Sequence, residues 1–187
     1  SGNYDISYLR CIPNIILMTP ADEDETRKLL TTAYEFKGPA AVRYPRGSGP
    51  NSIVDQELSS IEIGKARIIR EGESKVIFLN FGSLLHEAKI VSEKLNLTLI
   101  DMRFVKPLDR EVLREYLSDA SMFVSLEDGS IAGGAGSAVQ EFCSEENILI
   151  QSKLFGIPDK FIEHSTREEM IRECGLDANS LEEAIKS

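Results

Sequence analysis

Two arginines, Arg43 and Arg46, are the side chains best suited to bind an anion. They stand in the run VRYPRG, at the end of a short apolar segment and beside a proline and a glycine. A guanidinium can bind a phosphate or a carboxylate through two parallel hydrogen bonds. The same arginines could instead form surface salt bridges, each contributing about 0 to 1 kcal/mol. The residue types alone leave both interpretations open.

Two carboxylates, Glu127 and Asp128, follow a short apolar run and precede a turn with glycines at positions 129, 133, 134 and 136. Neighbouring carboxylates can serve as general acid and base, but the sequence places no histidine or further carboxylate beside them. We therefore predict surface or interdomain contacts for both side chains. No G-x-S-x-G run is present, so no Ser/His/Asp set can be proposed.

The glycine turn could hold a phosphate at the N-terminus of the helix that follows it. It lacks the Gly-Lys-Ser/Thr ending of a phosphate-binding loop, because Ser137 and Ala138 follow Gly136. The dinucleotide-binding spacing also fails, because Val139 stands where Gly or Ala is required. For residues Gly133 to Ser137 we favour close packing of strand against helix over anion binding.

The run DMRFVKPLD, residues 101–109, follows another strand at the end where open α/β sheets usually bind ligands. Pro107 at the first position of a helix, with Leu108 and Asp109 in its first turn, would explain most of the run as a helix start. We predict a structural turn here.

Strands and helices alternate along the chain and must position these residues. Residues 14–18, 21–36 and 40–44 predict a strand, a helix and a strand, with Leu29, Leu30, Ala33 and Tyr34 as the buried stripe of the helix. Further on we expect a hairpin at 64–70 and 75–81, strands at 97–101, 122–126 and 147–151, and helices at 82–95, 108–117, 137–143, 167–174 and 180–186. The alternation predicts a mostly parallel five-stranded sheet with helices on both faces, in which the first hairpin strand is antiparallel.

Composition narrows the class of protein. The chain has 187 residues, 42% of them hydrophobic, and a formal net charge of -10, which predicts a globular protein that attracts neither nucleic acid nor an anionic membrane. Cys11, Cys143 and Cys174 form no C-x-x-C pair, which favours a reduced, cytoplasmic protein. His86 and His164 are far apart, so we expect no metal site. No apolar run is long enough for a membrane helix.

Several runs, in order along the chain, resemble the 1-deoxy-D-xylulose-5-phosphate synthase family of transketolase-like enzymes. These runs are YDISYLRCIP (4–13), AVRYPRG (41–47), DMRFVKPLD (101–109), GGAGS (133–137), GIPD (156–159) and EEM (168–170). The resemblance implies an α/β fold like the transketolase C-terminal domain over residues 64–187. It also implies a linker at 48–63 and, at 1–47, a strand–helix–strand remnant of the pyrimidine-binding domain.

The resemblance also implies an activity. The family condenses pyruvate with glyceraldehyde 3-phosphate, releases CO2 and makes a precursor of isoprenoids, using thiamine diphosphate and Mg2+. Arg46 matches the arginine that binds the phosphate of the aldehyde substrate, whereas no role is transferred to Arg43. The family's diphosphate and Mg2+ motifs and its activating glutamate are not among these residues. We therefore expect no catalytic residue, no bound cofactor and no synthase activity in this chain by itself.

The resemblance further implies that the partners are the remaining domains of the same enzyme in a homodimer. Two other interpretations remain. The chain could be the corresponding domain of a transketolase or a 2-oxo acid dehydrogenase, although the VRYPRG and DMRFVKPLD runs argue against this. It could also be a non-catalytic subunit of a split enzyme, paired with a separate chain that binds the cofactor. A reading frame that continues upstream of Ser1 would favour a fragment, and a native start codon there would favour a split subunit.

Overall fold

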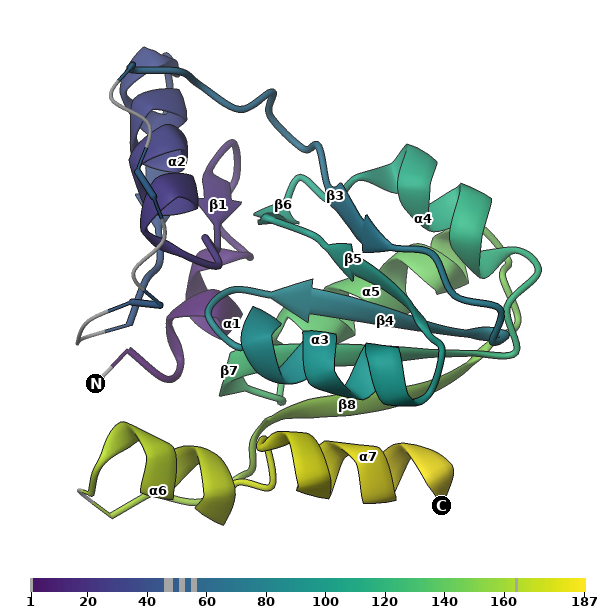
Figure 1. The fold of residues 1–187 in the computed structure, drawn as a ribbon. Helices are drawn as coiled ribbons and strands as arrows, with labels where there is room; N and C mark the ends of the chain where they lie inside the picture. The colour runs from purple at the N-terminus through teal and green to yellow at the C-terminus, as the bar shows by residue number, and fades with distance from the viewer. Residues whose placement is uncertain (1, 46–48, 51–52, 55–56, 164) are drawn as a thin grey trace.

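The structure is a computed structural model that describes residues 2–45, 49–50, 53–54, 57–163 and 165–187. Its strands are β1 (Ile16–Met18), β2 (Ala40–Val42), β3 (Arg67–Arg70), β4 (Val76–Phe81), β5 (Thr98–Asp101), β6 (Phe104–Lys106), β7 (Met122–Ser130) and β8 (Gln151–Ile157). Its helices are α1 (Asp5–Leu9), α2 (Glu23–Glu35), α3 (Leu85–Lys94), α4 (Arg110–Leu117), α5 (Ala135–Glu145), α6 (Arg167–Glu173) and α7 (Ala178–Lys186). Figure 1 shows their arrangement.

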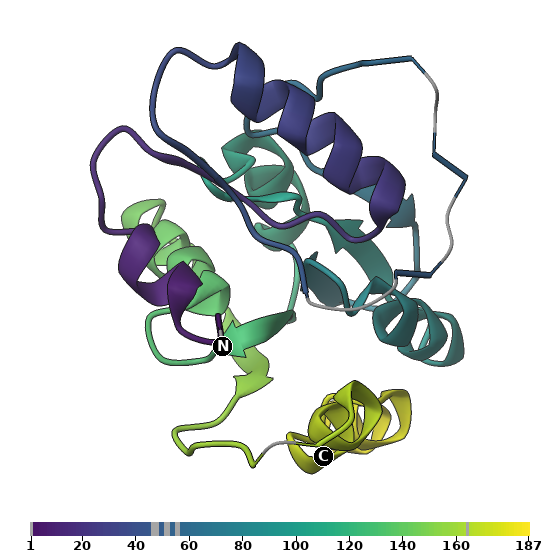
Figure 2. The same ribbon diagram turned by 90° about the vertical axis from the view of Figure 1, so that its left-hand side faces the viewer.

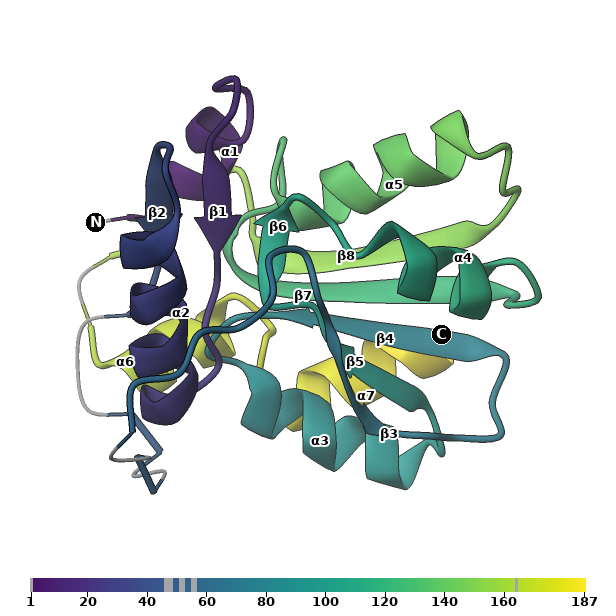
Figure 3. The ribbon, with the colours of Figure 1, turned by 90° about the horizontal axis from the view of Figure 1, so that it is seen from above.

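The large sheet has five strands in the order β3-β5-β4-β7-β8. Strands β5, β4, β7 and β8 run parallel, and β3 is antiparallel to β5. Helices α4 and α5 cover one face and α3 and α7 the other, as Figure 3 shows from above. The predicted α/β class, with a mostly parallel five-stranded sheet and helices on both faces, is confirmed.

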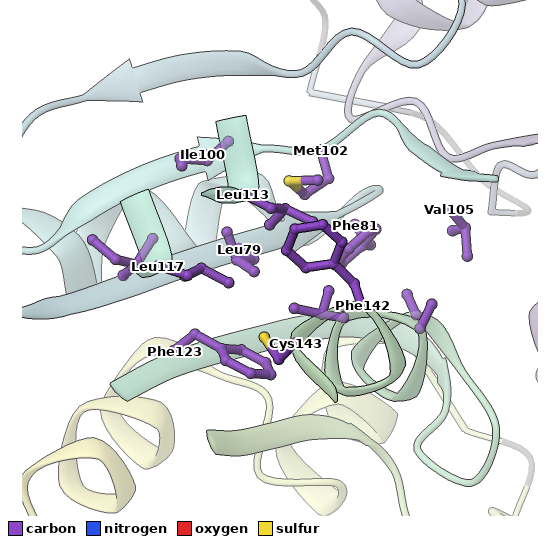
Figure 4. Packing of buried hydrophobic residues seen from close by; sticks show 14 of the residues in the cluster. Leu79, Phe81, Ile100, Met102, Val105, Leu113, Leu117, Phe123, Phe142 and Cys143 are labelled. Atoms are coloured by element: carbon purple, nitrogen blue, oxygen red, sulfur yellow. The ribbon is translucent and has the colours of Figure 1, made fainter. Parts of the chain in front are cut away.

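The core on the α4 and α5 side forms around two phenylalanines. Phe81 from β4 and Phe142 from α5 are buried there with Leu113 and Leu117 from α4 (Figure 4). Leu113 and Leu117 are four residues apart and so lie on one face of their helix. Asp109 begins that helix, because its carboxylate accepts a hydrogen bond from the backbone N of Val112 at 3.2 Å. Helix α4 therefore begins at Arg110, whereas the sequence predicts Pro107 at its first position and Leu108 and Asp109 in its first turn.

The predicted hairpin of β3 and β4 is wrong, because β5 lies between these two strands. The connection from β3 to β4 instead runs along the start of β5. There Gly72 N donates to Thr98 Oγ1 at 3.0 Å, and Ser74 N donates to Asn96 O at 3.1 Å. A Cβ on Gly72 would lie 2.2 Å from Asn96 O, so this crossing requires glycine.

The strand predicted at 147–151 is also misplaced, since β8 spans Gln151–Ile157. Asn147 takes a positive φ of 58°, and the backbone N of Ile148 donates to Cys143 O at 2.9 Å. These residues therefore end α5 and do not begin a strand. Ile148 and Ile150 pack instead against the core on the α4 and α5 side.

The predicted buried stripe of α2 is half wrong. Leu29 is buried, but Leu30 and Tyr34 are 47% and 88% exposed. Polar contacts set the orientation of the helix, because Thr32 Oγ1 accepts from Ile61 N at 2.8 Å and donates to Ile61 O at 3.0 Å. Glu25, on the same face, is 2% exposed and ion-paired. The hydrophobic pattern alone could not reveal these contacts.

A second sheet has three strands in the order β2-β1-β6, so it joins two strands that precede the predicted linker at 48–63 to one strand that follows it. Strands β1 and β2 are parallel, with α2 between them in sequence, as predicted. The run predicted as a turn, residues 101–109, contributes β6, which pairs antiparallel with β1. Its turn residue Arg103 has a positive φ of 59°. Figure 2 shows α2 packed beside this part of the molecule.

The three cysteines are free. Among the residues that the structure describes, no helix has the length and apolar character needed to span a membrane.

Candidate functional site

The Arg43 guanidinium is the centre of a network at the end of β2. Its Nε donates to both carboxylate oxygens of Asp5, at 3.0 and 3.2 Å. Its Nη1 pairs with the carboxylate of Asp128, and its Nη2 donates to the carbonyl oxygens of Gly2 at 3.0 Å and Asp128 at 2.9 Å. We call Asp5, Arg43 and Asp128 the Arg43 clamp. The side chain of Arg43 is 12% exposed, so the clamp is an internal contact and neither a surface salt bridge nor an open anion site.

Three separate elements supply the clamp. Asp5 is the first residue of α1, Arg43 follows β2, and Asp128 lies in β7 of the large sheet. Asp128 is held in turn by Ser83, whose Oγ donates to Asp128 Oδ2 at 2.5 Å. Arg167, at the start of α6, donates from Nη2 to the same Ser83 Oγ at 2.8 Å. The clamp therefore ties the N-terminal segments to the carboxyl ends of β4 and β7.

A cavity of about 690 Å³ lies beside the clamp. Its polar lining includes Arg43, Asp128 and Arg167, and its wall includes Tyr44 and Pro45. The apolar lining includes Ile157, Ile162, Met170, Ile171 and Leu176. This volume is within the range of small-molecule sites, roughly 300 to 1,000 Å³. Arg46, the predicted phosphate-binding residue, follows Pro45 in the sequence and lies outside the described residues.

The neighbouring carboxylates Glu127 and Asp128 lie in different environments. Asp128 contacts Arg43, which follows β2 in the N-terminal part of the chain. Glu127 is 1% exposed and faces the interior, so the prediction of a surface or interdomain contact is wrong for it. Glu127 Oε2 accepts from Ala135 N at 2.9 Å, and Oε1 accepts from Gly136 N at 3.0 Å. Glu127 therefore satisfies the backbone donors at the start of α5. Burial raises the pKa of its carboxyl to about 7, and the two backbone hydrogen bonds oppose that rise.

The carboxylate of Glu127 packs against the glycine turn and accepts the hydrogen bonds of the helix that follows it. A Cβ on Gly134 would lie 2.4 Å from both Glu127 Oε2 and Ser130 O, so glycine is needed for the close approach. The predicted tight packing of strand against helix is present. A diphosphate does not fit here, because Glu127 already occupies the helix N-terminus. Nor do any three His, Cys, Asp or Glu side chains within the described part of the chain come together as metal ligands.

A second charged cluster, which sequence reasoning missed, joins α2 to the large sheet. Arg103 donates from Nε and Nη2 to Glu25 at 3.0 and 2.6 Å. Arg67 donates from Nη2 to Asp101 Oδ2 at 3.0 Å and lies 3.4 Å from Glu25. Burial, and then the charge of Glu25, raise the pKa of Asp101 to about 6. Asp101 and Arg103 are close in sequence, but Glu25 and Arg67 lie far from them and from each other, so no local spacing could have indicated this cluster.

Two parts of the chain match models of known protein families. Residues 64–181, well over half of the chain, match the model of the transketolase C-terminal domain. The chain belongs to the transketolase C-terminal domain family. Residues 1–51 match the model of the transketolase pyrimidine binding domain. The clamp therefore joins a segment that matches one transketolase domain to a transketolase C-terminal domain.

Among curated proteins, the chain is similar to 1-deoxy-D-xylulose-5-phosphate synthases. It is 53% identical over 186 residues to that of Pseudomonas paraeruginosa and 51% identical over 185 residues to that of Pseudomonas syringae pv. tomato. The alignments include 100% and 99% of this chain but only 30% and 29% of those proteins. The chain thus spans less than a third of the length of these relatives.

Two solved structures share the fold of this transketolase C-terminal domain and the segment before it. A split gene transketolase, described as an inactive β4 tetramer, superposes with a TM-score of 0.88 at 29% identity, over 100% of this chain and 61% of that one. Transketolase from Campylobacter jejuni superposes with a TM-score of 0.68 at 17% identity, over 97% of this chain and 27% of that one.

Proposed function

We propose that this chain is part of a 1-deoxy-D-xylulose-5-phosphate synthase. Such an enzyme is a thiamine diphosphate-dependent transferase that condenses pyruvate with glyceraldehyde 3-phosphate and releases CO2. The observation that carries the proposal is the identity of 53% over 186 residues to a protein of that name. Because the chain spans 30% of that protein, the activity belongs to a longer polypeptide that includes these residues.

In this proposal residues 1–47 end the pyrimidine-binding domain, residues 48–63 are the linker and residues 64–187 are the C-terminal domain. The three-stranded sheet supports a close association of the two domains, since β6 pairs with β1. Lys106 adds to it, because its Nζ donates to the carbonyls of Arg10 at 3.0 Å and Ile12 at 2.6 Å.

Arg46 binds the phosphate of the aldehyde substrate. Two observations support this assignment. Tyr44 and Pro45, which precede Arg46, line the 690 Å³ cavity. Arg43, the other arginine of the VRYPRG run, already pairs with Asp5 and Asp128 and so has its guanidinium occupied.

Thiamine diphosphate and Mg2+ bind to other parts of the longer protein. The glycine turn after β7 does not fit a diphosphate, and no metal-ligand cluster forms among the residues described here. The functional unit in this proposal is a homodimer in the cytoplasm.

The test is release of CO2 from pyruvate in the presence of glyceraldehyde 3-phosphate, thiamine diphosphate and Mg2+. We expect turnover by the full-length protein and none by the 187-residue chain. Arg46→Ala in the full-length protein should raise the KM for glyceraldehyde 3-phosphate, and Arg46→Lys should raise it less, because lysine keeps the charge but loses the bidentate geometry. Turnover by the chain alone, or an Arg46→Ala enzyme with unchanged KM, would contradict the proposal.

A split enzyme is the second candidate, and one observation favours it. The split gene transketolase matches all of this chain with a TM-score of 0.88. In this alternative the chain is a non-catalytic subunit that pairs with a separate cofactor-binding chain. A native start codon at Ser1, and turnover only after that second chain is added, would support it.

A further inference from the structure

We propose that Asp101 is a proton-controlled latch between α2 and the large sheet. A proton on its carboxylate strengthens the attachment of α2, and loss of that proton loosens it. Helix α2 lies in the segment that matches the pyrimidine binding domain, and Asp101 lies in the C-terminal domain. The latch therefore makes the contact between these two regions sensitive to pH, a property separate from the proposed reaction.

The first observation is that four charged side chains meet between α2 and the large sheet. Arg103 donates to both carboxylate oxygens of Glu25, the member of the cluster that lies on α2. Arg67 lies between two carboxylates, with Nη1 at 3.4 Å from Glu25 Oε1 and Nη2 at 3.0 Å from Asp101 Oδ2. The side chains of Glu25 and Asp101 are 2% and 0% exposed. Two buried carboxylates on opposite sides of the contact thus share one guanidinium.

The groups that face Asp101 come from three elements. Strand β3 supplies Arg67, and strand β4 supplies the neutral amide of Asn80, whose Nδ2 donates to Asp101 Oδ1 at 3.2 Å. Helix α2 supplies the carboxylate of Glu25, and its N-cap residue Asp22 adds a further negative charge that acts on Arg67. Burial, followed by the charge of Glu25, favours the neutral form of Asp101 and raises its pKa to about 6.

The second observation is what an ionised Asp101 does to the contact. It competes with Glu25 for Arg67 and repels Glu25, in a place where little water screens the two charges. When α2 moves away, water reaches Asp101, and its pKa returns toward the ordinary value of 3.8. The attached state therefore binds the proton more tightly than the detached state. Attachment is strongest below about pH 4 and weakens as the pH rises through about 6.

The third observation is that the apolar contact between α2 and the residues after the linker is small. Leu29 shares a cluster of four buried residues with Phe104 of β6. Thr32 adds two hydrogen bonds to the backbone of Ile61. With so small an apolar contact, the charged cluster contributes a large part of the attachment, and a change of one charge within it should alter how often α2 opens.

The experiment measures how often α2 opens, by hydrogen–deuterium exchange and mass spectrometry of the full-length protein. Peptides within residues 23–35 are followed from pH 5 to 7.5, and each exchange rate is divided by the intrinsic rate at that pH. A pKa of about 6 in the attached state and 3.8 in the detached state increases the opening equilibrium by about tenfold over this range. We expect this increase in the wild type and a constant opening equilibrium in Asp101→Asn, which cannot ionise.

Two further variants separate the latch from general damage. Glu25→Gln removes the charge on α2 that opposes ionisation of Asp101. It should raise opening at every pH, because Arg103 loses its ionic partner, and it should reduce the tenfold increase with pH. This variant keeps the test valid if Asp101→Asn does not fold. Glu141→Gln is the matched control: it breaks another ion pair between the two regions, with Arg10 at 2.5 Å, and should leave the increase unchanged.

Peptides of β7, a central strand of the large sheet, show whether α2 opens by itself, and they should exchange more slowly than α2 at every pH. Equal opening of α2 and β7 would overturn the inference, because the pH dependence would then belong to unfolding of the whole region. An increase with pH that is unchanged in the folded Asp101→Asn or Glu25→Gln protein would also overturn it, and so would a wild-type opening equilibrium that is constant from pH 5 to 7.5.

Discussion

Replacing Glu127 by glutamine should remove a large part of the pH dependence of stability between about pH 4.5 and 7. Glu127 is buried, and burial raises the pKa of its carboxyl from 4.5 to about 7 in the folded protein. In the unfolded chain the carboxyl is exposed to water and loses its proton near the lower value. Between these two pH values the folded state holds more protons, so the free energy of unfolding falls as the pH rises.

The difference between a pKa of 4.5 and one of about 7 corresponds to about 3 kcal/mol, at 1.36 kcal/mol per pKa unit. This stabilisation is complete below pH 4.5 and is lost as the pH rises through 7. Glutamine does not titrate. Its carbonyl can accept from one of Ala135 N and Gly136 N, but its amide group then faces the other N–H, at a cost of about 1 to 3 kcal/mol at every pH.

The assay is urea unfolding of wild type and Glu127→Gln at several pH values from 4.5 to 7.5. Far-UV circular dichroism is the appropriate probe, since the chain contains no tryptophan. The buried Asp101, whose pKa is raised to about 6, contributes to the pH dependence of both proteins and cancels in their difference. Glu141→Gln serves as an exposed control. We expect the free energy of unfolding of wild type to fall by about 3 kcal/mol relative to Glu127→Gln over this range.

A difference that stays constant from pH 4.5 to 7.5 would refute this reasoning. It would mean that the two backbone hydrogen bonds compensate fully for burial, so that Glu127 titrates alike in both states.

Two further predictions concern stability. Gly134→Ala should destabilise the chain by about 1 to 3 kcal/mol in urea unfolding, because its Cβ would lie 2.4 Å from both Glu127 Oε2 and Ser130 O; wild-type stability would contradict the closed turn. On α2, Leu29→Ala should cost about 2 to 5 kcal/mol, because Leu29 is fully buried. As a comparison on the exposed face of α2, Tyr34→Ser should change the free energy of unfolding by no more than about 0.5 kcal/mol, because Tyr34 is 88% exposed. A large loss of stability in this variant would mean that this face of α2 is covered.

The sequence predicted the elements better than their pairing. Alternating apolar runs and helical periodicity are local properties, so the five-stranded sheet followed from them. The order of the strands depends on contacts between distant residues. The sequence predicts that Gly72 belongs to a hairpin turn. In the structure Gly72 instead lets the chain pass close to Asn96, and β5 lies between β3 and β4.

The sequence indicated which residue types form the candidate site but not which residues contact one another there. The VRYPRG run drew attention to Arg43, but the sequence left open whether its guanidinium binds an anion or forms a surface salt bridge, and the structure shows an internal ion pair instead. Its partners Asp5 and Asp128 are 38 and 85 residues away, beyond any local spacing rule. The sequence predicts a surface or interdomain contact for Glu127, although one signal points to its buried role: a glycine turn that brings a helix close to a strand leaves helix N–H groups in need of an acceptor.

The choice of donor substrate tests the central claim most directly. The full-length protein would be incubated with thiamine diphosphate, Mg2+ and glyceraldehyde 3-phosphate, together with either pyruvate or a ketose phosphate, and CO2 and sugar phosphate products would be quantified. The account predicts CO2 and 1-deoxy-D-xylulose 5-phosphate in equal amounts from pyruvate, and no transfer from the ketose phosphate. Ketol transfer from the ketose phosphate without release of CO2 would contradict it and would assign the protein to transketolase activity.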